Sequence, residues 1–418
     1  MIRSVTLEAV VADPRRALER WFGAGLAAVD PERLLPRFAA LESGGWVFRR
    51  GSRAISIDMP DRAAGGRLRI IAIGKAAASM ARGFAASLRG TGQVIDAGLV
   101  ITKDRTASSG DAPWQEILGD HPHPGERSVA AAQALLDFIG RPIAADRFVV
   151  LLSGGASALC ALPIAGITLE EKRRLVHELM ASGASIVEIN RLRSNLSALK
   201  GGKLARRISP AKLVTLAISD VPGDDLALIG SGPSFDPPRA PGVVIATLDD
   251  ALEAIAETAS AEGVAVRRLG RVLYGWLDDE VVRLRQAIQS ASPQAAPRLW
   301  VAGGEPRLMV RGSGRGGRAQ EFALRLARSF SSGPERGLPR TIHGLIAGTD
   351  GSDGPTDAAG GFFDNRSLAR LAAAGVDLDG VLTDNDSYPV LAAVGDRFVT
   401  GPTGTNVADV ALLLEVSG

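Results

Sequence analysis

The chain has 418 residues, with 48 lysines and arginines against 46 aspartates and glutamates, and a single cysteine. The balanced charge gives no sign of a nucleic-acid partner or an anionic membrane surface, and one cysteine excludes an internal disulfide framework and suits a reducing compartment. A chain of this length exceeds what one hydrophobic core usually serves, so we expect two domains.

No segment of the sequence is typical of a targeting signal or a membrane span. The N-terminal stretch carries Asp13 and several arginines where a signal peptide needs an uninterrupted apolar core. The uncharged window 149–169 is long enough to cross a bilayer, but two glycines and Pro163 interrupt it. We therefore expect a cytoplasmic protein.

The first strand–turn–helix pattern lies at residues 67–88. Residues 68–73 predict a buried strand, Gly74 a turn, and the alanine-rich stretch from Ala76 a helix. Lys75 then stands at the start of the helix, where a cation is electrostatically disfavoured unless an anion compensates it. The pattern favours an anion beside Lys75, and a solvated surface lysine is the alternative.

A proline-rich loop follows the next predicted strand, 97–104, and carries His121 and His123. Two histidines at this spacing could bind zinc, but the sequence offers no other cluster of soft ligands. We therefore interpret both histidines as residues that shape the loop or contact a substrate.

The stretch 148–158 reads FVVLLSGGASA. Its five leading apolar residues predict a strand buried on both faces, and Ser153, Gly154 and Gly155 predict a tight turn before a helix. Glycines let a ligand approach the backbone, and the free N–H groups of a first helical turn attract an anion, with the hydroxyls of Ser153 and Ser157 beside them. The stretch predicts a phosphate or carboxylate cradle, with an ordinary turn of an α/β protein as the alternative.

Further polar residues that could belong to the same binding site follow later in the sequence. Two helices are predicted at 169–184 and 185–199, and Arg193, Asn195 and Lys200 would face the same region if the strand order is conventional. The next strand, 213–218, ends before Asp220, and the carboxyl end of a buried strand is where open α/β sheets place ligands. Asp220 is therefore a candidate metal ligand or proton acceptor.

The stretch 237–297 contains two weaker strand–helix patterns, and we place the boundary between the halves here. The predicted organisation is a Rossmann-like, mostly parallel α/β domain at 1–245, a connecting strand–helix region at 246–297, and a second α/β domain with a mixed sheet at 298–418.

The second half opens with a predicted hairpin, in which strands 299–302 and 307–310 enclose two glycines. It continues into a G-x-G-x-x-G match formed by Gly312, Gly314 and Gly317 before a helix from Arg318. A dinucleotide site would need an acidic residue about twenty positions later at the end of the next strand, and none is suitably placed. The arginines of this loop favour pairing with phosphate or carboxylate oxygens.

An acidic loop follows the next strand and contains Asp350, Asp353 and Asp357. These carboxylates could orient a hydrated Mg²⁺ or accept a proton from an alcohol. Near the C-terminus we predict a final strand at 397–399 and a last helix that Thr405 or Asn406 caps.

The chain contains no Walker A sequence and no protein-kinase motif set. Seven motifs in order nevertheless resemble the glycerate 2-kinase family, whose relatives are sometimes labelled hydroxypyruvate reductases. They are IGKAAASMA (73–81), LSGGASAL (152–159), NRLRSNLSALKGGKLA (190–205), ISDVPGDDLALIGSGP (218–233), GRGGRAQEFAL (314–324), GTDGSDGPTDAAGG (348–361) and TGPTGTNVAD (400–409).

This resemblance implies a kinase that transfers a phosphoryl group from ATP to D-glycerate, giving 2-phosphoglycerate, with a divalent cation such as Mg²⁺. It implies a MOFRL-type second domain and an active site in the interdomain cleft, with the family's essential lysine at Lys75 and its essential arginine at Arg318. Asp220, or one of Asp350 and Asp353, would hold Mg²⁺ or take the proton from the C2 hydroxyl. The resemblance does not assign which of these aspartates is the metal ligand and which is the base. The candidate substrate- and nucleotide-binding residues are Ser153, Gly154, Gly155, Ser157, Arg193, Asn195, Lys200, Glu305, Gly314, Arg315 and Gly317.

The sequence departs from the family pattern where Ala319 replaces the usual asparagine and where Pro306 and Arg307 replace threonines. The first change removes an amide beside the key arginine, which puts substrate orientation or rate in question. An NAD(P)H-dependent hydroxypyruvate reductase and a non-catalytic sensor of phosphosugars or acids are the alternative functions. The oligomeric state cannot be read from the sequence.

Overall fold

The computed structural model describes residues 6–42, 44–105, 113–182, 186–292, 296–331 and 340–417. The chain forms two compact units. Unit 1 consists of Met1–Val29, Leu248–Thr403 and Val407–Gly418, and unit 2 consists of Asp30–Thr247 and Gly404–Asn406. The chain therefore passes from one unit to the other four times.

These units differ from the predicted boundaries in three places, one of which is the short segment Gly404–Asn406 within the predicted second domain. The first 29 residues belong to unit 1, and the region predicted as a connector, 246–297, contributes a strand and two helices to unit 1 from Leu248 onward. Contacts made in three dimensions decide both assignments, because helix α2 (Pro14–Ala28) packs on helix α10 (Leu248–Ala261).

Unit 2 contains a six-stranded sheet in the order β6-β5-β4-β7-β8-β9, and every neighbouring pair is parallel. This confirms the predicted Rossmann-like parallel sheet, and the strand order reverses between β4 and β7. Each residue of β7 is buried, as its continuous apolar run predicts. The strands are β4 (Leu68–Ile73), β5 (Ala97–Thr102), β6 (Trp114–Leu118), β7 (Arg147–Leu152), β8 (Lys212–Ile218) and β9 (Gly242–Ala246).

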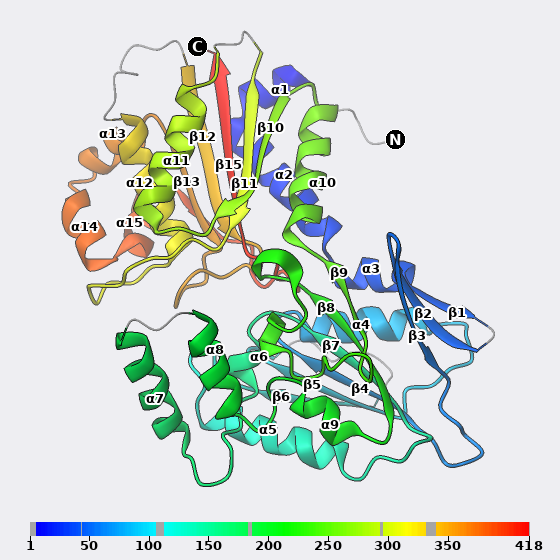
Figure 1. Ribbon diagram of the computed structural model, residues 1–418. Helices are drawn as coiled ribbons and strands as arrows, with labels where there is room; N and C mark the ends of the chain where they lie inside the picture. Colours follow the sequence, from blue (N-terminus) through cyan, green and yellow to red (C-terminus); the bar gives the residue numbers. More distant parts are fainter. Residues whose placement is uncertain are drawn as a thin grey trace. The chain divides into compact units, whose positions relative to one another are not determined.

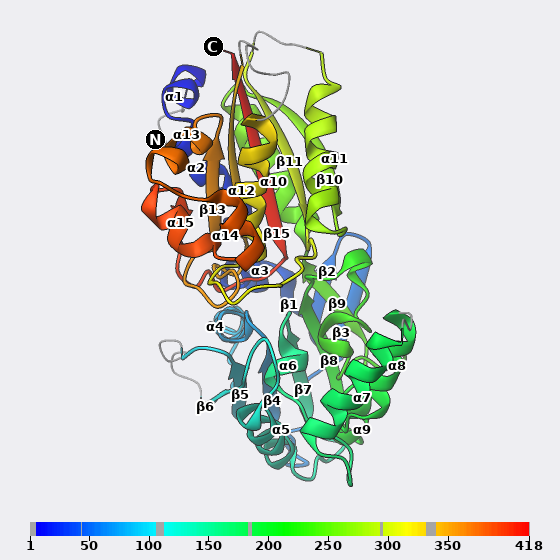
Figure 2. The ribbon, with the colours of Figure 1, turned by 90° about the vertical axis from the view of Figure 1, so that its left-hand side faces the viewer.

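Helices cover both faces of this sheet (Figure 2). One core joins β4, β5, β7 and β8 to α5 (Glu126–Ile139), α6 (Ala156–Leu159) and α9 (Lys203–Ile208). On the other face α4 (Ala77–Ser87) packs on β4, β5 and β7 and is joined by α3 (Pro31–Phe38). The remaining elements are α7 (Leu169–Ala181), α8 (Ile186–Asn195), the short helices η1 (Pro222–Asp224) and η2 (Ile229–Ser231), and an antiparallel sheet of β1 (Ala39–Glu42), β2 (Gly45–Arg50) and β3 (Arg53–Asp58).

The predicted helices 169–184 and 185–199 correspond to α7 and α8, and their junction at 183–185 lies outside the described residues. Helix α8 ends at Asn195, four residues earlier than predicted. The Nζ of Lys203 donates to the carbonyl oxygens of Ser194 and Ser197, which stabilises this helix end.

Unit 1 contains a mixed six-stranded sheet in the order β10-β11-β15-β12-β13-β14 (Figure 1). Only β10 and β11 pair in parallel among these described strands, and the other pairs are antiparallel. The strands are β10 (Ala265–Leu273), β11 (Arg298–Gly304), β12 (Arg340–Gly348), β13 (Gly360–Asp364), β14 (Arg397–Phe398) and β15 (Asp409–Ser417).

Two predictions for this half are wrong. The C-terminal stretch forms strand β15 between β11 and β12 rather than a helix, because its apolar run is buried by pairing on both sides. The predicted hairpin is also absent, because the stretch after β11 makes a single bridge between Arg307 and Trp276 in place of a second strand.

Helices cover both faces of the mixed sheet (Figure 1). Helices α2 and α10 pack on one face, and the indole and guanidinium N–H groups of Trp21 and Arg20 in α2 donate to the carboxylate of Glu262. Within the described residues, no helix combines the length and apolar composition needed to cross a lipid bilayer. Helices α11 (Leu277–Gln289) and α12 (Arg318–Ser331) pack on the face of the sheet opposite α2. The remaining helices of unit 1 are α1 (Leu7–Ala12), α13 (Ser367–Ala373), α14 (Leu378–Asp384) and α15 (Ser387–Ala393).

Candidate active site

In unit 2 the loops that follow β4 and β7 meet at the carboxyl edge of the sheet, at the point where the strand order reverses. The backbone N–H of Lys75 donates to the carbonyl of Gly154 at 2.9 Å, and the N–H of Ala76 donates to the Oγ of Ser153 at 3.0 Å. Ser153 is fully buried. Its hydroxyl oxygen therefore joins the two loops and holds Lys75 at the start of α4.

Asp220 follows β8 and lies against the same turn. Its Oδ2 accepts a hydrogen bond from the Nδ2 of Asn406 at 2.9 Å. A Cβ atom on Gly154 would lie 1.7 Å from this oxygen and 2.3 Å from the Nδ2, so only glycine leaves room for the pair. Asn406 caps no helix, in contrast to its predicted role, and instead orients the Asp220 carboxylate.

Gly155 has a φ of +82°, which favours glycine. A Cβ atom there would lie 3.1 Å from the Cγ of Lys75 and 3.3 Å from the Cδ2 of His121. The turn after β7 is thus flanked by Lys75 and by one of the two loop histidines. The Oγ of Ser157 lies 3.3 Å from the Oγ of Ser231, which belongs to the segment after β8.

The other predicted binding residues of unit 2 lie around the end of α8. Arg193 and Asn195 belong to its last turn, and Asn195 is exposed. Lys200 is 7% exposed and lines a small cavity with Ala156 and Cys160, and the N–H of the adjacent Gly201 donates to the carbonyl of Ser231. The structure therefore ties Lys200 to the segment after β8.

In unit 1 the guanidinium of Arg318 is held by two carboxylates. Its Nε and Nη2 donate to Asp409 at 2.6 and 3.2 Å, and its Nη1 donates to Glu305 at 2.6 Å. Burial opposes the Arg318 charge, but Asp409 and Glu305 outweigh it and raise the pKa of Arg318 above its ordinary value. Glu305 thus contacts Arg318, while its predicted binding of a substrate or nucleotide stays a prediction.

Sequence reasoning did not find Asp409. It is 5% exposed and stands at the first residue of β15, after Ala408, whose φ is +76°. Burial raises the pKa of Asp409, although Arg318 acts in the opposite direction. No sequence signal pointed to the Arg318–Asp409 pair, because the stretch that forms β15 was predicted as a helix.

Asp353 caps helix α12, and its predicted role as a metal ligand stays a prediction. Its two oxygens accept hydrogen bonds from the backbone N–H groups of Ala319 and Gln320 at 3.1 and 2.9 Å, and Oδ2 also accepts from the Gln320 side chain. Burial, followed by repulsion from Asp409, raises the pKa of Asp353 to about 6. With both oxygens engaged, Asp353 fixes the helix turn that begins with Arg318.

The second predicted metal ligand, Asp350, is 8% exposed, and its Oδ1 accepts from the N–H and the Oγ of Ser352 at 2.9 and 3.2 Å. Its charge also raises the pKa of Asp409, so these two carboxylates are near one another. Among the described residues, no group of three or more histidines, cysteines or acids could hold a metal ion by itself.

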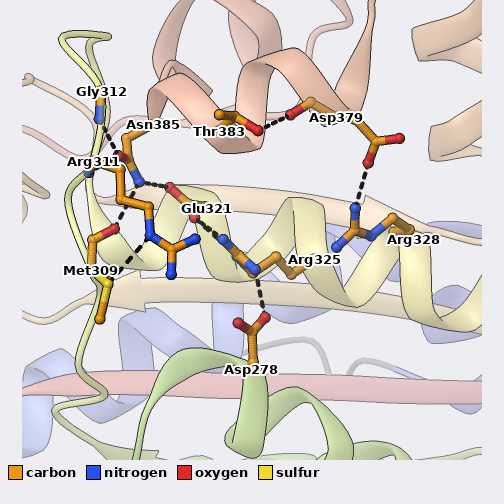
Figure 3. A network of polar contacts seen from close by, with 10 residues as sticks. All are labelled: Asp278, Met309, Arg311, Gly312, Glu321, Arg325, Arg328, Asp379, Thr383 and Asn385. Carbon is orange, nitrogen blue, oxygen red and sulfur yellow. Dashed lines mark hydrogen bonds and ion pairs between the residues drawn. The ribbon is translucent and has the colours of Figure 1, made fainter.

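The glycine-rich loop, residues 311–317, is held by the junction of α14 and α15 (Figure 3). The Oδ1 of Asn385 accepts from the N–H groups of Arg311 and Gly312 at 2.7 and 3.1 Å, and its Nδ2 donates to the buried Glu321 at 2.9 Å. The N–H of Gly314 donates to the carbonyl of Asp384 at 2.9 Å.

Gly314 and Gly317 pack closely against other residues of unit 1, and their predicted role in binding a substrate or nucleotide stays a prediction. A Cβ on Gly314 would lie 2.5 Å from an Asp384 oxygen, and one on Gly317 would lie 2.2 Å from the Asp353 carboxylate. The glycines are needed for packing inside unit 1. The N–H of Arg315 is also engaged, since it donates to Asp386 at 2.7 Å.

The Arg315 side chain is exposed and lies over the ring of Tyr388, 4.3 Å from its centroid. Its predicted role in binding a phosphate or carboxylate stays a prediction. Ala319, the departure from the family pattern, is fully buried, and its N–H contributes to the Asp353 cap.

The structure defines a two-unit α/β protein. One unit places a lysine, a serine–glycine turn and a carboxylate at the carboxyl edge of a doubly wound sheet, and the other holds an arginine between two carboxylates at a helix start. Two family models match the chain, namely the Domain of unknown function (DUF4147) at residues 17–262 and the MOFRL family at 298–409.

Similarity to individual proteins extends over most of the chain. The D-glycerate 2-kinase of Thermotoga maritima is 34% identical over 398 residues, which cover 84% of this chain and 91% of that protein. A putative hydroxypyruvate reductase of Agrobacterium vitis is 35% identical over 445 residues, covering 96% and 94%. The crystal structure of the Thermotoga maritima glycerate kinase matches with a TM-score of 0.74 at 28% identity, covering 97% of this chain and all of that one. The chain belongs to the glycerate 2-kinase family.

Proposed function

We propose that this protein is a glycerate 2-kinase, which transfers the γ-phosphoryl group of ATP to the C2 hydroxyl of D-glycerate and forms 2-phosphoglycerate and ADP. The observation that carries the proposal is the near full-length similarity to the Thermotoga maritima D-glycerate 2-kinase. The site residues support it, because phosphoryl transfer depends mainly on positioning and on neutralising negative charge.

In the proposed reaction the C2 oxygen of glycerate bonds to the γ-phosphorus while the bond from that phosphorus to the β,γ-bridging oxygen breaks. The proton of the C2 hydroxyl passes to a carboxylate. Asp220 suits this role because Asn406 fixes its orientation, and Asp350 is the other candidate. Lys75 and Arg318 are proposed to bind the phosphoryl group and the glycerate carboxylate, as the family resemblance implies.

Mg²⁺ is proposed as the divalent cation, because it usually takes one or two protein carboxylates and completes its shell with water and phosphate oxygens. A pre-formed cluster of ligands is therefore not required. Asp220 or Asp350 would supply the carboxylate, and Asp353 is less suited because both of its oxygens already accept hydrogen bonds from N–H groups of α12. Bound there, Mg²⁺ would neutralise charge on the phosphate groups.

A hydroxypyruvate reductase is the second candidate, because a relative from Agrobacterium vitis is named a putative hydroxypyruvate reductase. The glycine-rich loop does not favour it. The G-x-G-x-x-G match does not follow directly on a strand, because β11 ends at Gly304, and the N–H groups of Arg311, Gly312 and Gly314 are hydrogen-bonded within unit 1.

A coupled assay with D-glycerate, ATP and MgCl₂ tests the proposal, with the product position read by phosphorus NMR. We expect ADP and 2-phosphoglycerate, and loss of both in Lys75→Ala and Arg318→Ala proteins that keep the circular dichroism spectrum. Oxidation of NADH or NADPH by hydroxypyruvate without kinase activity would establish the reductase instead, and tight ligand binding without either turnover would indicate a sensor. The cytoplasmic location stays a prediction.

A further inference from the structure

One tyrosine of unit 1, Tyr388, has two arginine side chains over its ring. The guanidinium carbon of Arg315 lies 4.3 Å from the ring centroid, and that of Arg397 lies 4.8 Å from it. The two guanidinium carbons are therefore no further apart than the sum of these distances. Each contact with the ring is favourable, but the two like charges repel each other. The ring thus concentrates two positive charges at one place in unit 1.

The three residues come from separate segments, and hydrogen bonds fix their positions. The N–H of Tyr388 donates to the carbonyl of Arg315 at 2.9 Å, and the N–H of Arg315 donates to Asp386 at 2.7 Å. The Tyr388 hydroxyl donates to Asp357 at 2.7 Å, and Arg397 belongs to β14, which pairs with β13. The two guanidinium groups are therefore brought together before any ligand binds.

The guanidinium N–H groups of Arg315 and Arg397 make no hydrogen bond or ion pair with any residue that the structure describes. The nearest carboxylates along the chain have other donors. Asp386 accepts from a backbone N–H, and the buried Asp396 accepts from the guanidinium of Arg370 at 2.6 Å. The donors of both arginines that lie over the ring are therefore available to a ligand.

Asp357 offsets part of the positive charge of this group. The hydrogen bond from Tyr388 lowers the pKa of Asp357, and the charges of Arg397 and Arg315 act in the same direction, while desolvation opposes them. The Asp357 carboxylate is exposed and already accepts the tyrosine hydroxyl. One carboxylate cannot balance two guanidinium groups, so the group favours an anionic ligand.

We propose that Arg315 and Arg397, held over the ring of Tyr388, form a binding site for a phosphate group on unit 1. A guanidinium fork can occupy both oxygens of a carboxylate, whereas a phosphate group has enough acceptor oxygens to serve two forks. Neither Tyr388 nor Arg397 was among the site residues that the sequence predicted, because their roles depend on three segments meeting in the fold.

The identity of the ligand, though not the site itself, rests on the proposed kinase function. Arg315 lies on the loop that leads into Arg318, to which the family resemblance assigns binding of the reacting groups. The phosphate group then belongs to the nucleotide or to 2-phosphoglycerate. Free inorganic phosphate presents the same oxyanion, so the three sources are compared as separate ligands.

Isothermal titration calorimetry of the full chain with ADP, 2-phosphoglycerate or sodium phosphate tests the site, at about 0.15 M ionic strength to screen distant charges. The test variant is Arg315→Gln/Arg397→Gln. The control, Arg328→Gln/Arg366→Gln, removes the same charge from two exposed arginines of unit 1. We expect the Kd of at least one ligand to rise about 10-fold or more in the test variant and to change by under about 2-fold in the control.

Tyr388→Leu separates the geometry of the site from its charge, because it keeps both arginines and removes the ring that holds them. We expect it to raise the Kd of the same ligand by about 3-fold or more, since the guanidinium groups lose their preorganisation. Circular dichroism checks that each variant is folded. If Tyr388→Leu does not fold, the arginine double variant decides the test, because Arg315 is exposed and Arg397 is only partly buried.

The ligand whose Kd rises in the arginine double variant is the source of the phosphate group, and a rise with inorganic phosphate alone assigns the site to free phosphate. The proposal would be overturned by equal Kd values in the double variant and the control, by a folded Tyr388→Leu protein that binds like the wild type, or by a wild type that binds none of the three ligands. Binding that depends on both arginines in a protein without kinase activity would support this site and refute the proposed function alone.

Discussion

At the scale of single residues, Arg318 is a charged group whose orientation is fixed by two carboxylates of unit 1. It directs three N–H groups at two carboxylates, and the pair with Asp409 has the two-bond geometry that a planar guanidinium forms. A lysine has a single ammonium that cannot reproduce this fork. The side chain is therefore both charged and oriented before any substrate arrives.

We expect Arg318→Lys to lower kcat/KM at least 100-fold, which corresponds to about 3 kcal/mol of transition-state stabilisation. Steady-state kinetics with D-glycerate and ATP measure this change. Arg328→Lys is the matched control, because Arg328 lies on the same helix and makes an exposed ion pair with Asp379. Comparable activity of Arg318→Lys and the control would show that charge alone suffices at this position.

Gly154 illustrates a second residue whose role is set by its neighbours. The sequence predicted a glycine that admits a ligand, and the structure shows a glycine that admits the Asp220 carboxylate and the Asn406 amide. We expect Gly154→Ala to displace this pair, to destabilise the fold by about 1–3 kcal/mol and to reduce kcat.

Urea unfolding and the kinase assay measure the two effects of Gly154→Ala. Gly23→Ala is the control, since Gly23 lies in α2 with no atom within 4 Å of the added Cβ. That change should stabilise the fold by up to about 1 kcal/mol through helix propensity. Unchanged stability and activity in Gly154→Ala would mean that the Asp220–Asn406 pair moves without cost.

At the scale of elements, the glycine-rich loop is fixed by Asn385. This residue is 7% exposed and has a φ of +57°, which places its side chain between the loop and Glu321 (Figure 3). Removing the side chain would leave two loop N–H groups and one oxygen of a buried carboxylate without this partner.

We expect Asn385→Ala to destabilise the protein by about 3 kcal/mol, because buried groups left unpaired cost more than the hydrogen bonds themselves contribute. Urea unfolding measures the loss. Asn385→Gly should be less destabilised than Asn385→Ala by about 1 kcal/mol, since glycine accepts a positive φ. Thr383→Ala, at an exposed position of α14, should change stability by under about 0.5 kcal/mol. A loss at Asn385→Ala no larger than that at Thr383→Ala would contradict the role of Asn385.

The elements that the sequence predicted well are those whose pattern is local. The buried runs at β4, β7 and β8 each ended in polar turn residues, and the structure places all three strands side by side in one parallel sheet. Strand β15 was missed because a fully buried apolar run has no alternation that separates a strand from a helix. Because this strand was predicted wrongly, Asp409 was not identified as a site residue. Its role depends on the ion pair with Arg318, which lies 91 positions earlier in the sequence.

At the scale of the whole molecule, the assignment of chain segments to the two units is the feature that is hardest to predict from the sequence. Residues 1–29 belong to the unit built from the C-terminal half, and the segment Gly404–Asn406 belongs to the unit built from the N-terminal half. Neither assignment follows from composition or periodicity, because both depend on contacts between distant segments. Trp21 and Glu262, which lie 241 positions apart in the sequence, form one such contact.

Glu262 therefore offers a test of how much the N-terminal helices contribute to stability. Its carboxylate, with a side chain 9% exposed, accepts from both Arg20 and the buried Trp21. In Glu262→Ala the Trp21 N–H would lose its partner and stay buried, so we expect a loss of about 2–3 kcal/mol in the free energy of unfolding. Glu257→Ala, at an exposed position of α10, the helix that ends just before Glu262, should cost under about 0.5 kcal/mol. Urea unfolding followed by tryptophan fluorescence compares the two. Equal midpoints would show that α2 is held by its apolar face alone, through Leu18 and Phe22, and that the polar contact adds no net stability.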